Sequence, residues 1–178
     1  MAGNFFIFWL VLIGFLVVIL GSFAFAGILA APWVPLWKKD VRRMLELAGV
    51  KEGETVFDLG AGDGRIVIMA AKEFGAKSVG FEIAFLPYFL AYIKIILSGK
   101  KKNINLRFKN FYHQDFSQAD VICTFLSPQA MLKLKPKLQT ETKPGCRIIS
   151  YVFKIPDWQP TKIDKPNQNQ AAIYLYQR

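Results

Sequence analysis

A strand-like apolar stretch that leads directly into a glycine-rich turn, residues 55–68, constrains the fold of this chain more than any other feature. Residues Thr55–Leu59 have the short apolar pattern of a buried strand, and the residues after Gly64 have the periodicity of a helix. Gly60 and Gly62 permit the sharp turn between them, because glycine adopts backbone angles that other residues avoid. The stretch therefore predicts the first half of a βαβ unit.

Helix patterns and strand patterns alternate along the rest of the chain. The expected strands are Thr55–Leu59 and residues 78–83, 104–110, 119–125, 147–153 and 173–176. The expected helices are residues 40–48, 65–74, 85–97 and 128–138. This order predicts an α/β fold, a Rossmann-like doubly wound and mostly parallel sheet with a short terminal antiparallel strand. Residues 156–170 are expected to form a loop or a short hairpin arm.

The turn carries two carboxylates, Asp58 and Asp63, which would repel the pyrophosphate of a dinucleotide. Its glycine spacing is G-x-G-x-G, whereas dinucleotide sites use G-x-G-x-x-G. The carboxylates suit the cationic α-amino group and sulfonium of S-adenosylmethionine. Glu82 lies where a carboxylate can accept hydrogen bonds from both ribose hydroxyls. These residues predict an S-adenosylmethionine site and methyl transfer, with a plain structural turn or another nucleotide as the alternatives.

Asn110 and Phe111 lie at the end of the third expected strand and are expected to bound the adenine ring. Asn110 would bond the exocyclic amine, and Phe111 would donate its backbone amide or pack on the ring. The expected cofactor set is Asp58, Gly60, Gly62, Asp63, Glu82, Asn110 and Phe111. His113, the single histidine, is expected to be a surface loop residue rather than a catalytic base.

The N-terminal part of the chain has no charged side chain before Lys38, although the chain has 23 basic and 13 acidic residues. Residues 5–31 are rich in Phe, Leu, Val and Ile, and a helix of this length crosses a hydrocarbon core of about 30 Å. Pro32 and Pro35 are expected to end that helix. The sequence therefore predicts a transmembrane anchor in residues 1–35 and one domain in residues 36–178.

A cleaved signal peptide is the alternative to the anchor, because residues 24–26 (Ala-Phe-Ala) resemble a cleavage site. The run has no basic residue ahead of it and is too long for a signal peptide, which favours a retained anchor. Basic residues at 38–43 follow the run, so the positive-inside rule places the domain on the cytoplasmic side, or on the matrix side of a mitochondrial membrane.

Four segments carry a resemblance that covers nearly the whole chain: residues 32–35 (Pro-Trp-Val-Pro), 56–67, 123–131 and 153–158. In the glycine turn, in Glu82 and in everything downstream, the chain resembles class I, seven-strand S-adenosylmethionine-dependent methyltransferases. In the four segments, and in Lys137 and Leu138 after the third, it more closely resembles the membrane-anchored lysine methyltransferases of the ATP synthase c-subunit and adenine nucleotide translocase type. The resemblance implies S-adenosylmethionine as cofactor and a lysine of a membrane-embedded protein as acceptor. Residues 36–40 depart from it, since relatives often carry small polar residues there.

The resemblance also places the acceptor nitrogen near residues 126–129, where Ser127 and Gln129 are expected to orient it. Phe125, Tyr151 and Trp158 are candidates for an acceptor channel, with Trp158 the best placed in a Pro-flanked loop. The Asn-Pro-Pro-Tyr motif of amide and adenine methyltransferases is absent from the sequence. A lipid or quinone-like acceptor, or a non-catalytic module that binds the cofactor at a membrane, are the alternatives.

Other chemistries have weaker support in the sequence. Cys123 and Cys146 lie in apolar runs without metal-ligand spacing, so they are expected to be buried and no metal site is predicted. The net charge of +10 includes basic patches at residues 100–102 and 133–137, but aromatic residues are not interleaved with them. A basic face near anionic lipid is therefore favoured over nucleic acid as a partner, and the oligomeric state is left open.

Overall fold

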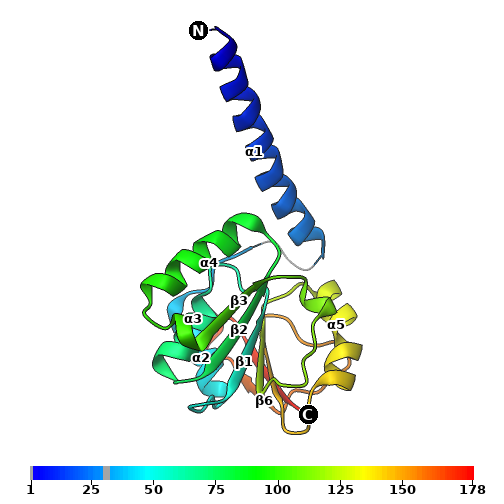
Figure 1. Cartoon of the computed structure of the whole chain (residues 1–178). Helices are drawn as coiled ribbons and strands as arrows, with labels where there is room; N and C mark the ends of the chain where they lie inside the picture. Colours follow the sequence, from blue (N-terminus) through cyan, green and yellow to red (C-terminus); the bar gives the residue numbers. More distant parts are fainter. Residues whose placement is uncertain (1, 30–32) are drawn as a thin grey trace.

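The computed structural model describes residues 2–29 and 33–178, and Figure 1 shows an α/β domain with one long helix rising from it. This helix, α1 (Ala2–Leu29), contains the window Phe5–Ile28, which is long and apolar enough to cross a membrane by length and composition alone. None of the window is buried inside the molecule. The expected helix end at Pro32 lies outside the described residues.

A seven-stranded sheet forms the centre of the domain, in the order β3-β2-β1-β4-β5-β7-β6. Its strands are β1 (Thr55–Leu59), β2 (Lys77–Glu82), β3 (Ile104–Phe108), β4 (Val121–Thr124), β5 (Arg147–Tyr151), β6 (Lys162–Asp164) and β7 (Ile173–Gln177). Strand β7 pairs antiparallel with both β5 and β6, while the other pairs are parallel. The predicted mostly parallel sheet is confirmed, and β6 forms the hairpin arm that residues 156–170 were expected to contain.

Four helices surround the sheet: α2 (Lys38–Leu47), α3 (Arg65–Glu73), α4 (Phe85–Leu97) and α5 (Pro128–Glu141). Two 3-10 turns, η1 (Lys101–Asn103) and η2 (Phe111–His113), flank β3. Helix α5 runs three residues past the expected end at Leu138, through Pro136. Its buried residues, including Met131 and Leu134, pack on the sheet, and this packing outweighs the backbone hydrogen bond that Pro136 cannot make.

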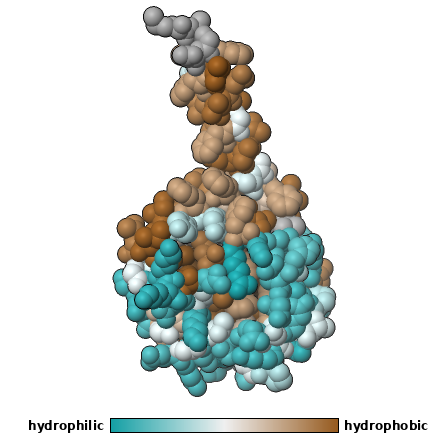
Figure 2. Space-filling model, viewed as in Figure 1, coloured by the Kyte–Doolittle hydropathy of each residue, from teal (hydrophilic) through white to brown (hydrophobic). Residues whose placement is uncertain are grey.

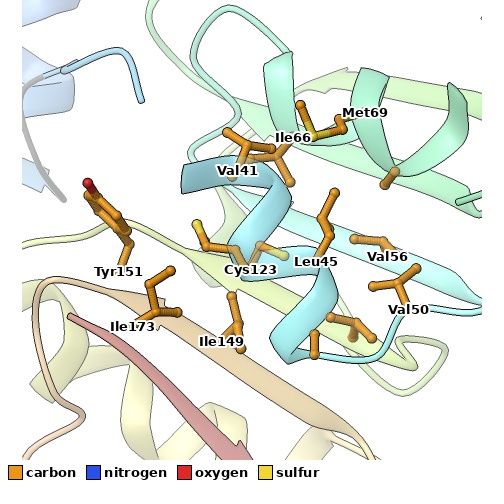
Figure 3. Packing of buried hydrophobic residues seen from close by; sticks show 14 of the residues in the cluster. Val41, Leu45, Val50, Val56, Ile66, Met69, Cys123, Ile149, Tyr151 and Ile173 are labelled. Atoms are coloured by element: carbon orange, nitrogen blue, oxygen red, sulfur yellow. The ribbon is translucent and has the colours of Figure 1, made fainter. Parts of the chain in front are cut away.

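Neighbouring residues along the central strands face opposite sides of the sheet, as the pleat requires. One face buries Phe57 and Ile148 against α5. The other buries Val56 and Ile149 against α2 and α3, and Figure 3 shows part of this second cluster. Both cysteines are buried, as expected. The two packed faces fix β1 as a rigid central strand whose carboxyl end leads into the glycine turn.

Candidate active site

A cavity opens at the carboxyl ends of β1 and β2, next to the point where the strand order reverses between β1 and β4. Ligands in open α/β sheets bind at such a switch point, because the loops on either side diverge there. The cavity holds about 820 Å³ of space, including its open mouth. Its lining includes all but one of the expected cofactor residues, namely Asp58, Gly60, Gly62, Asp63, Glu82 and Phe111.

Glu82, the last residue of β2, is held in place by three backbone N–H groups. Its Oε2 accepts a hydrogen bond from Gly62 N at 2.8 Å, and its Oε1 accepts from Ile83 N at 2.8 Å and Ala84 N at 2.7 Å. Burial raises the pKa of Glu82, although the three N–H groups act to lower it. A carboxylate has about four acceptor positions, so Glu82 retains capacity for a ligand hydroxyl in the cavity.

Asp58 lies in β1 with 2% of its surface exposed. Burial raises the pKa of its carboxyl to about 8, and the nearby carboxylates of Glu82 and Asp63 add to the rise. Within the described part of the chain, neither a cation nor a hydrogen bond offsets these effects. A cationic group bound in the cavity would supply that compensation, as the amino and sulfonium groups of S-adenosylmethionine do, and the residues present therefore fit this cofactor.

Asp63 has cationic partners within the protein, unlike Asp58. Its carboxylate forms salt bridges with Arg65 at 2.6 Å and with Lys94 of α4 at 2.5 Å. Burial alone would raise the pKa of Asp63, but the hydrogen bonds from Arg65 and Lys94 lower it overall. The expected role of Asp63 beside the cofactor cation is therefore shared with a structural one, in which it ties α4 to the glycine turn.

Asn110 and Phe111 occupy different positions around the cavity, although they are adjacent in the chain. Phe111 is buried and lines the cavity. Asn110 caps η2 by accepting the N–H of Tyr112 on its Oδ1 at 3.0 Å, and the cavity lining includes Lys109 rather than Asn110. The structure thus brings Phe111 together with the other expected cofactor residues and gives Asn110 a local structural contact.

Residues 33–36 close one side of the cavity, a role that motif spacing did not predict. The indole of Trp33 lies against Gly62, because a Cβ added there would be 2.6 Å from Trp33 Nε1. Gly62 also has a φ of +56°, so the turn requires glycine on both counts. The ring of Phe23 in α1 contacts Trp33, with 6.2 Å between centroids. The available signal in the sequence was the Pro-Trp-Val-Pro motif of residues 32–35, which carries part of the family resemblance.

Replacing Trp33 with Ala is expected to weaken S-adenosylmethionine binding about tenfold, roughly 1.4 kcal/mol, since the cavity loses the side chain that closes it over the turn. Isothermal titration calorimetry measures the change. Trp37→Ala is the matched control, because Trp37 is 74% exposed and does not line the cavity. Equal affinities for the two variants would contradict a role for Trp33 in binding.

The expected acceptor segment lies between the cofactor cavity and a second cavity. Leu126 lines the cofactor cavity, whereas Ser127 and Gln129 line the second, which holds about 530 Å³ including its open mouth. Phe25 and Ile28 of α1 form the other wall of the second cavity. The structure therefore places the two expected acceptor residues next to the C-terminal end of α1.

Ser127 and Gln129 differ in what their side chains do. Ser127 is the N-cap of α5, and its Oγ accepts the N–H of Ala130 at 3.3 Å. Gln129 is exposed in the first turn of the same helix. Ser127 therefore caps helix α5 in addition to any contact with the acceptor. Gln129 makes no such capping contact with any described residue and lines the second cavity with its amide side chain.

The aromatic residues expected in the acceptor channel, Phe125, Tyr151 and Trp158, do not share one cavity. Phe125 lines the cofactor cavity and meets Tyr151 edge to face, with 5.0 Å between centroids. Trp158 instead stacks on Tyr176 at 5.7 Å and packs against the hydrophobic core. His113 is exposed in η2. Of these side chains, Phe125 is the one that reaches the cofactor cavity.

The family model described as the ANTKMT methyltransferase domain matches residues 58–162. A protein-lysine N-methyltransferase of Saccharolobus islandicus (strain REY15A) is 42% identical over 149 residues, which cover 82% of this chain and 92% of the relative. A lysine N-methyltransferase of the ATP synthase c-subunit from Xenopus laevis is 35% identical over 137 residues, which cover 76% of this chain and 59% of the relative. This chain thus spans less than two thirds of the length of the Xenopus protein.

Solved structures show the same fold with the expected cofactor chemistry. An RNA methyltransferase from Salinibacter ruber in complex with S-adenosyl-L-homocysteine has a TM-score of 0.78 and 35% identity, over 81% of this chain and 93% of that chain. An S-adenosylmethionine-dependent methyltransferase from Geobacter sulfurreducens, at 16% identity and a TM-score of 0.59, covers 66% of this chain and 49% of that one and shares the fold alone. The chain belongs to the ANTKMT methyltransferase domain family and is an S-adenosylmethionine-dependent methyltransferase.

Proposed function

We propose that this enzyme methylates the Nζ of a lysine in a membrane protein. The relatives named as lysine N-methyltransferases support this proposal, among them an adenine nucleotide translocase lysine N-methyltransferase of Mus musculus, 31% identical over 147 residues. Residues 1–35 act as the anchor and residues 36–178 as the catalytic domain, on the cytoplasmic or matrix side of the membrane. The last residues of the anchor then also line the cofactor cavity.

The observation that carries the proposal is the position of α1 beside the acceptor segment. Phe25 and Ile28 of α1 face Ser127 and Gln129 across the second cavity. A lysine that reaches the cofactor through this cavity passes the end of the apolar helix. An acceptor held in the bilayer meets that condition more readily than a soluble metabolite, because anchoring both partners in one membrane raises their effective concentration.

Methyl transfer to an amine requires the neutral amine, which displaces sulfur in line at the methyl carbon. The cofactor supplies an electrophilic methyl group, and the chain supplies orientation and electrostatics. Lys133 lines the second cavity, and a nearby cation disfavours the protonated form of an incoming lysine. Gln129 orients the amine, Trp33 limits water over the glycine turn, and proximity accounts for most of the acceleration.

Tritiated methyl transfer into membrane fractions tests the acceptor class. We expect label in protein that survives lipid extraction, and mass spectrometry of membrane proteins with and without the gene should then locate methyl-lysine. Label confined to the lipid extract would instead identify a lipid or quinone-like acceptor. Label confined to RNA would contradict the proposal and match the name of the Salinibacter relative.

Replacing Gln129 with Ala is expected to lower kcat about tenfold without changing cofactor affinity, since Gln129 lines the second cavity and not the cofactor cavity. Methyl-transfer kinetics and calorimetry separate the two quantities. Gln139→Ala is the control, because Gln139 is exposed near the other end of α5. A parallel loss of cofactor affinity in Gln129→Ala would contradict an acceptor-side role.

A further inference from the structure

Helix α4 exposes an apolar face that the methyl-transfer site does not use. Its side chains are between 39% and 80% exposed, and they are Phe85, Phe89, Tyr92, Ile93, Ile96 and Leu97, here called the α4 face. At about 100° per residue they occupy a continuous arc of about 140° on the helix. Contiguous apolar surface of this kind marks an interaction site on a protein, whereas single exposed apolar residues do not.

The opposite side of α4 is fixed to the domain. Pro87, Ala91 and Ile95 are buried, and Lys94 binds Asp63 beside the glycine turn. The helix contains no acidic residue, and Lys94 is its single charge. The α4 face is therefore a rigid apolar surface, and the salt bridge between Lys94 and Asp63 fixes its helix to the wall of the cofactor cavity.

The α4 face is continuous with α1. The N–H of Phe85 donates to Ser22 Oγ of α1 at 3.4 Å, which satisfies one of the free N–H groups at the start of α4. Figure 1 shows α4 lying across the end of the domain from which α1 rises. In Figure 2 hydrophobic surface covers that end and joins the hydrophobic surface of α1, while the opposite end is largely hydrophilic.

The contact between Phe85 and Ser22 also fixes the position of the start of α4 along the axis of α1. From Phe5 to Ser22 the helix rises about 26 Å, at about 1.5 Å per residue. The hydrocarbon core of a bilayer is about 30 Å thick. If α1 spans the membrane from Phe5, the start of α4 lies close to the near boundary of the hydrocarbon, where a transverse apolar helix would be at the interface.

Basic residues follow the C-terminal end of α4. Lys100, Lys101 and Lys102 are exposed, and the ammonium group of Lys101 lies 5.8 Å from the ring centre of Tyr92. Helices that lie in the plane of a membrane combine an apolar face with flanking cations, which attract anionic head groups. The charges therefore match an anionic lipid surface in sign and in position.

We propose that the α4 face docks onto the anionic surface of the lipid bilayer that α1 enters, as a helix lying in the interface. This inference rests on the proposed membrane location and adds a second contact to it. Only Ile83 and Ala84 separate α4 from Glu82, so docking holds the cofactor cavity at a defined height and orientation against the membrane. The acceptor lysine is then restricted to a position close to the bilayer surface.

An environment-sensitive fluorophore on Ile93→Cys in the full chain tests the docking. Cys123 and Cys146 are fully buried, so the label attaches to the introduced thiol. The chain is reconstituted into phosphatidylcholine vesicles with about one quarter phosphatidylglycerol, a composition that gives an anionic surface. Ile163→Cys is the matched control, because Ile163 is also exposed but lies on β6, away from α1.

We expect the emission of the probe at position 93 to rise about twofold or more on reconstitution and to be quenched by nitroxide lipids, while the probe at 163 is unaffected. Replacing Lys100, Lys101 and Lys102 with Gln should reduce the quenching in anionic vesicles. An unquenched probe at 93 in chains that remain with the vesicles would overturn the docking and leave the α1 anchor intact. Chains that do not remain with the vesicles would instead overturn the anchor and, with it, the docking.

Discussion

Replacing Glu82 with Gln is expected to weaken S-adenosylmethionine binding about 100-fold, or about 2.7 kcal/mol. Three N–H groups, from Gly62, Ile83 and Ala84, converge on the carboxylate. A glutamine amide would direct its own N–H₂ group against at least one of these donors, and the remaining oxygen would lack the negative charge that strengthens the hydrogen bonds. The glycine turn and the ligand contact would therefore be lost together.

Isothermal titration calorimetry with S-adenosylmethionine measures this loss, and a thermal melt reports whether the domain still folds. Glu46→Gln is the control, because Glu46 is exposed on α2 and does not line the cofactor cavity. A folded Glu82→Gln protein that binds S-adenosylmethionine within twofold of the unmodified enzyme would contradict the expected role of Glu82 in cofactor binding. A lowered melting temperature with unchanged affinity would assign Glu82 to the turn alone.

The second large effect concerns Asp58, whose pKa burial raises to about 8. A cationic ligand favours the ionised carboxylate, so binding must release the proton that Asp58 holds below pH 8. Cofactor affinity is therefore expected to rise with pH between about 5.5 and 7, by up to tenfold per unit. This pH window lies below the pKa of an α-amino group, about 7.7–8.0, so the α-amino group of S-adenosylmethionine stays positively charged throughout it.

The same shift predicts the pH dependence of stability in the cofactor-free enzyme. The pKa of Asp58 rises from 3.8 to about 8 on folding, so the folded state retains a proton that the unfolded state releases. The free energy of unfolding should therefore decrease as pH rises from about 4 to 8, by up to about 1.4 kcal/mol per unit. Asp58→Asn should remove this slope, as urea denaturation at several pH values would show.

Asp58→Asn should also remove most of the pH dependence of binding and lower affinity at pH 7.5 about tenfold or more. Asp157→Asn is the matched control, since the side chain of Asp157 is 86% exposed. Calorimetry in two buffers of different ionisation enthalpy counts the protons released on binding. Equal proton release by the Asp58→Asn variant and the unmodified enzyme would show that another group titrates.

The structural features that the sequence predicted correctly are those set by local backbone geometry. Gly60 and Gly62 have positive φ values, and a turn of this shape requires glycine whatever surrounds it. Glu82 ends a strand beside β1, and parallel pairing brings the ends of adjacent strands together. The predicted strand ends were less accurate, since β3 ends at Phe108, before Asn110, which instead caps η2.

Contacts between distant segments account for what the sequence did not predict. In the sequence Asp63 was expected to lie beside the cation of the cofactor. Folding brings its carboxylate to Lys94, and the salt bridge between them neutralises its charge. Trp158 was expected in a Pro-flanked loop as part of the acceptor channel, but it stacks on Tyr176. Pattern reading detects neither contact, because the partners are far apart in sequence and each residue alone fits several environments.

The sequence by itself determined the doubly wound sheet, the glycine turn and S-adenosylmethionine as the cofactor, because backbone geometry and hydrophobic periodicity are local properties. The tertiary structure decided which surfaces stay exposed and what closes the cavity. It placed Trp33 over Gly62, and it left the α4 face uncovered beside α1. Burial depends on the packing of the whole chain, so periodicity alone does not distinguish a helix that is covered from one that is available to a membrane.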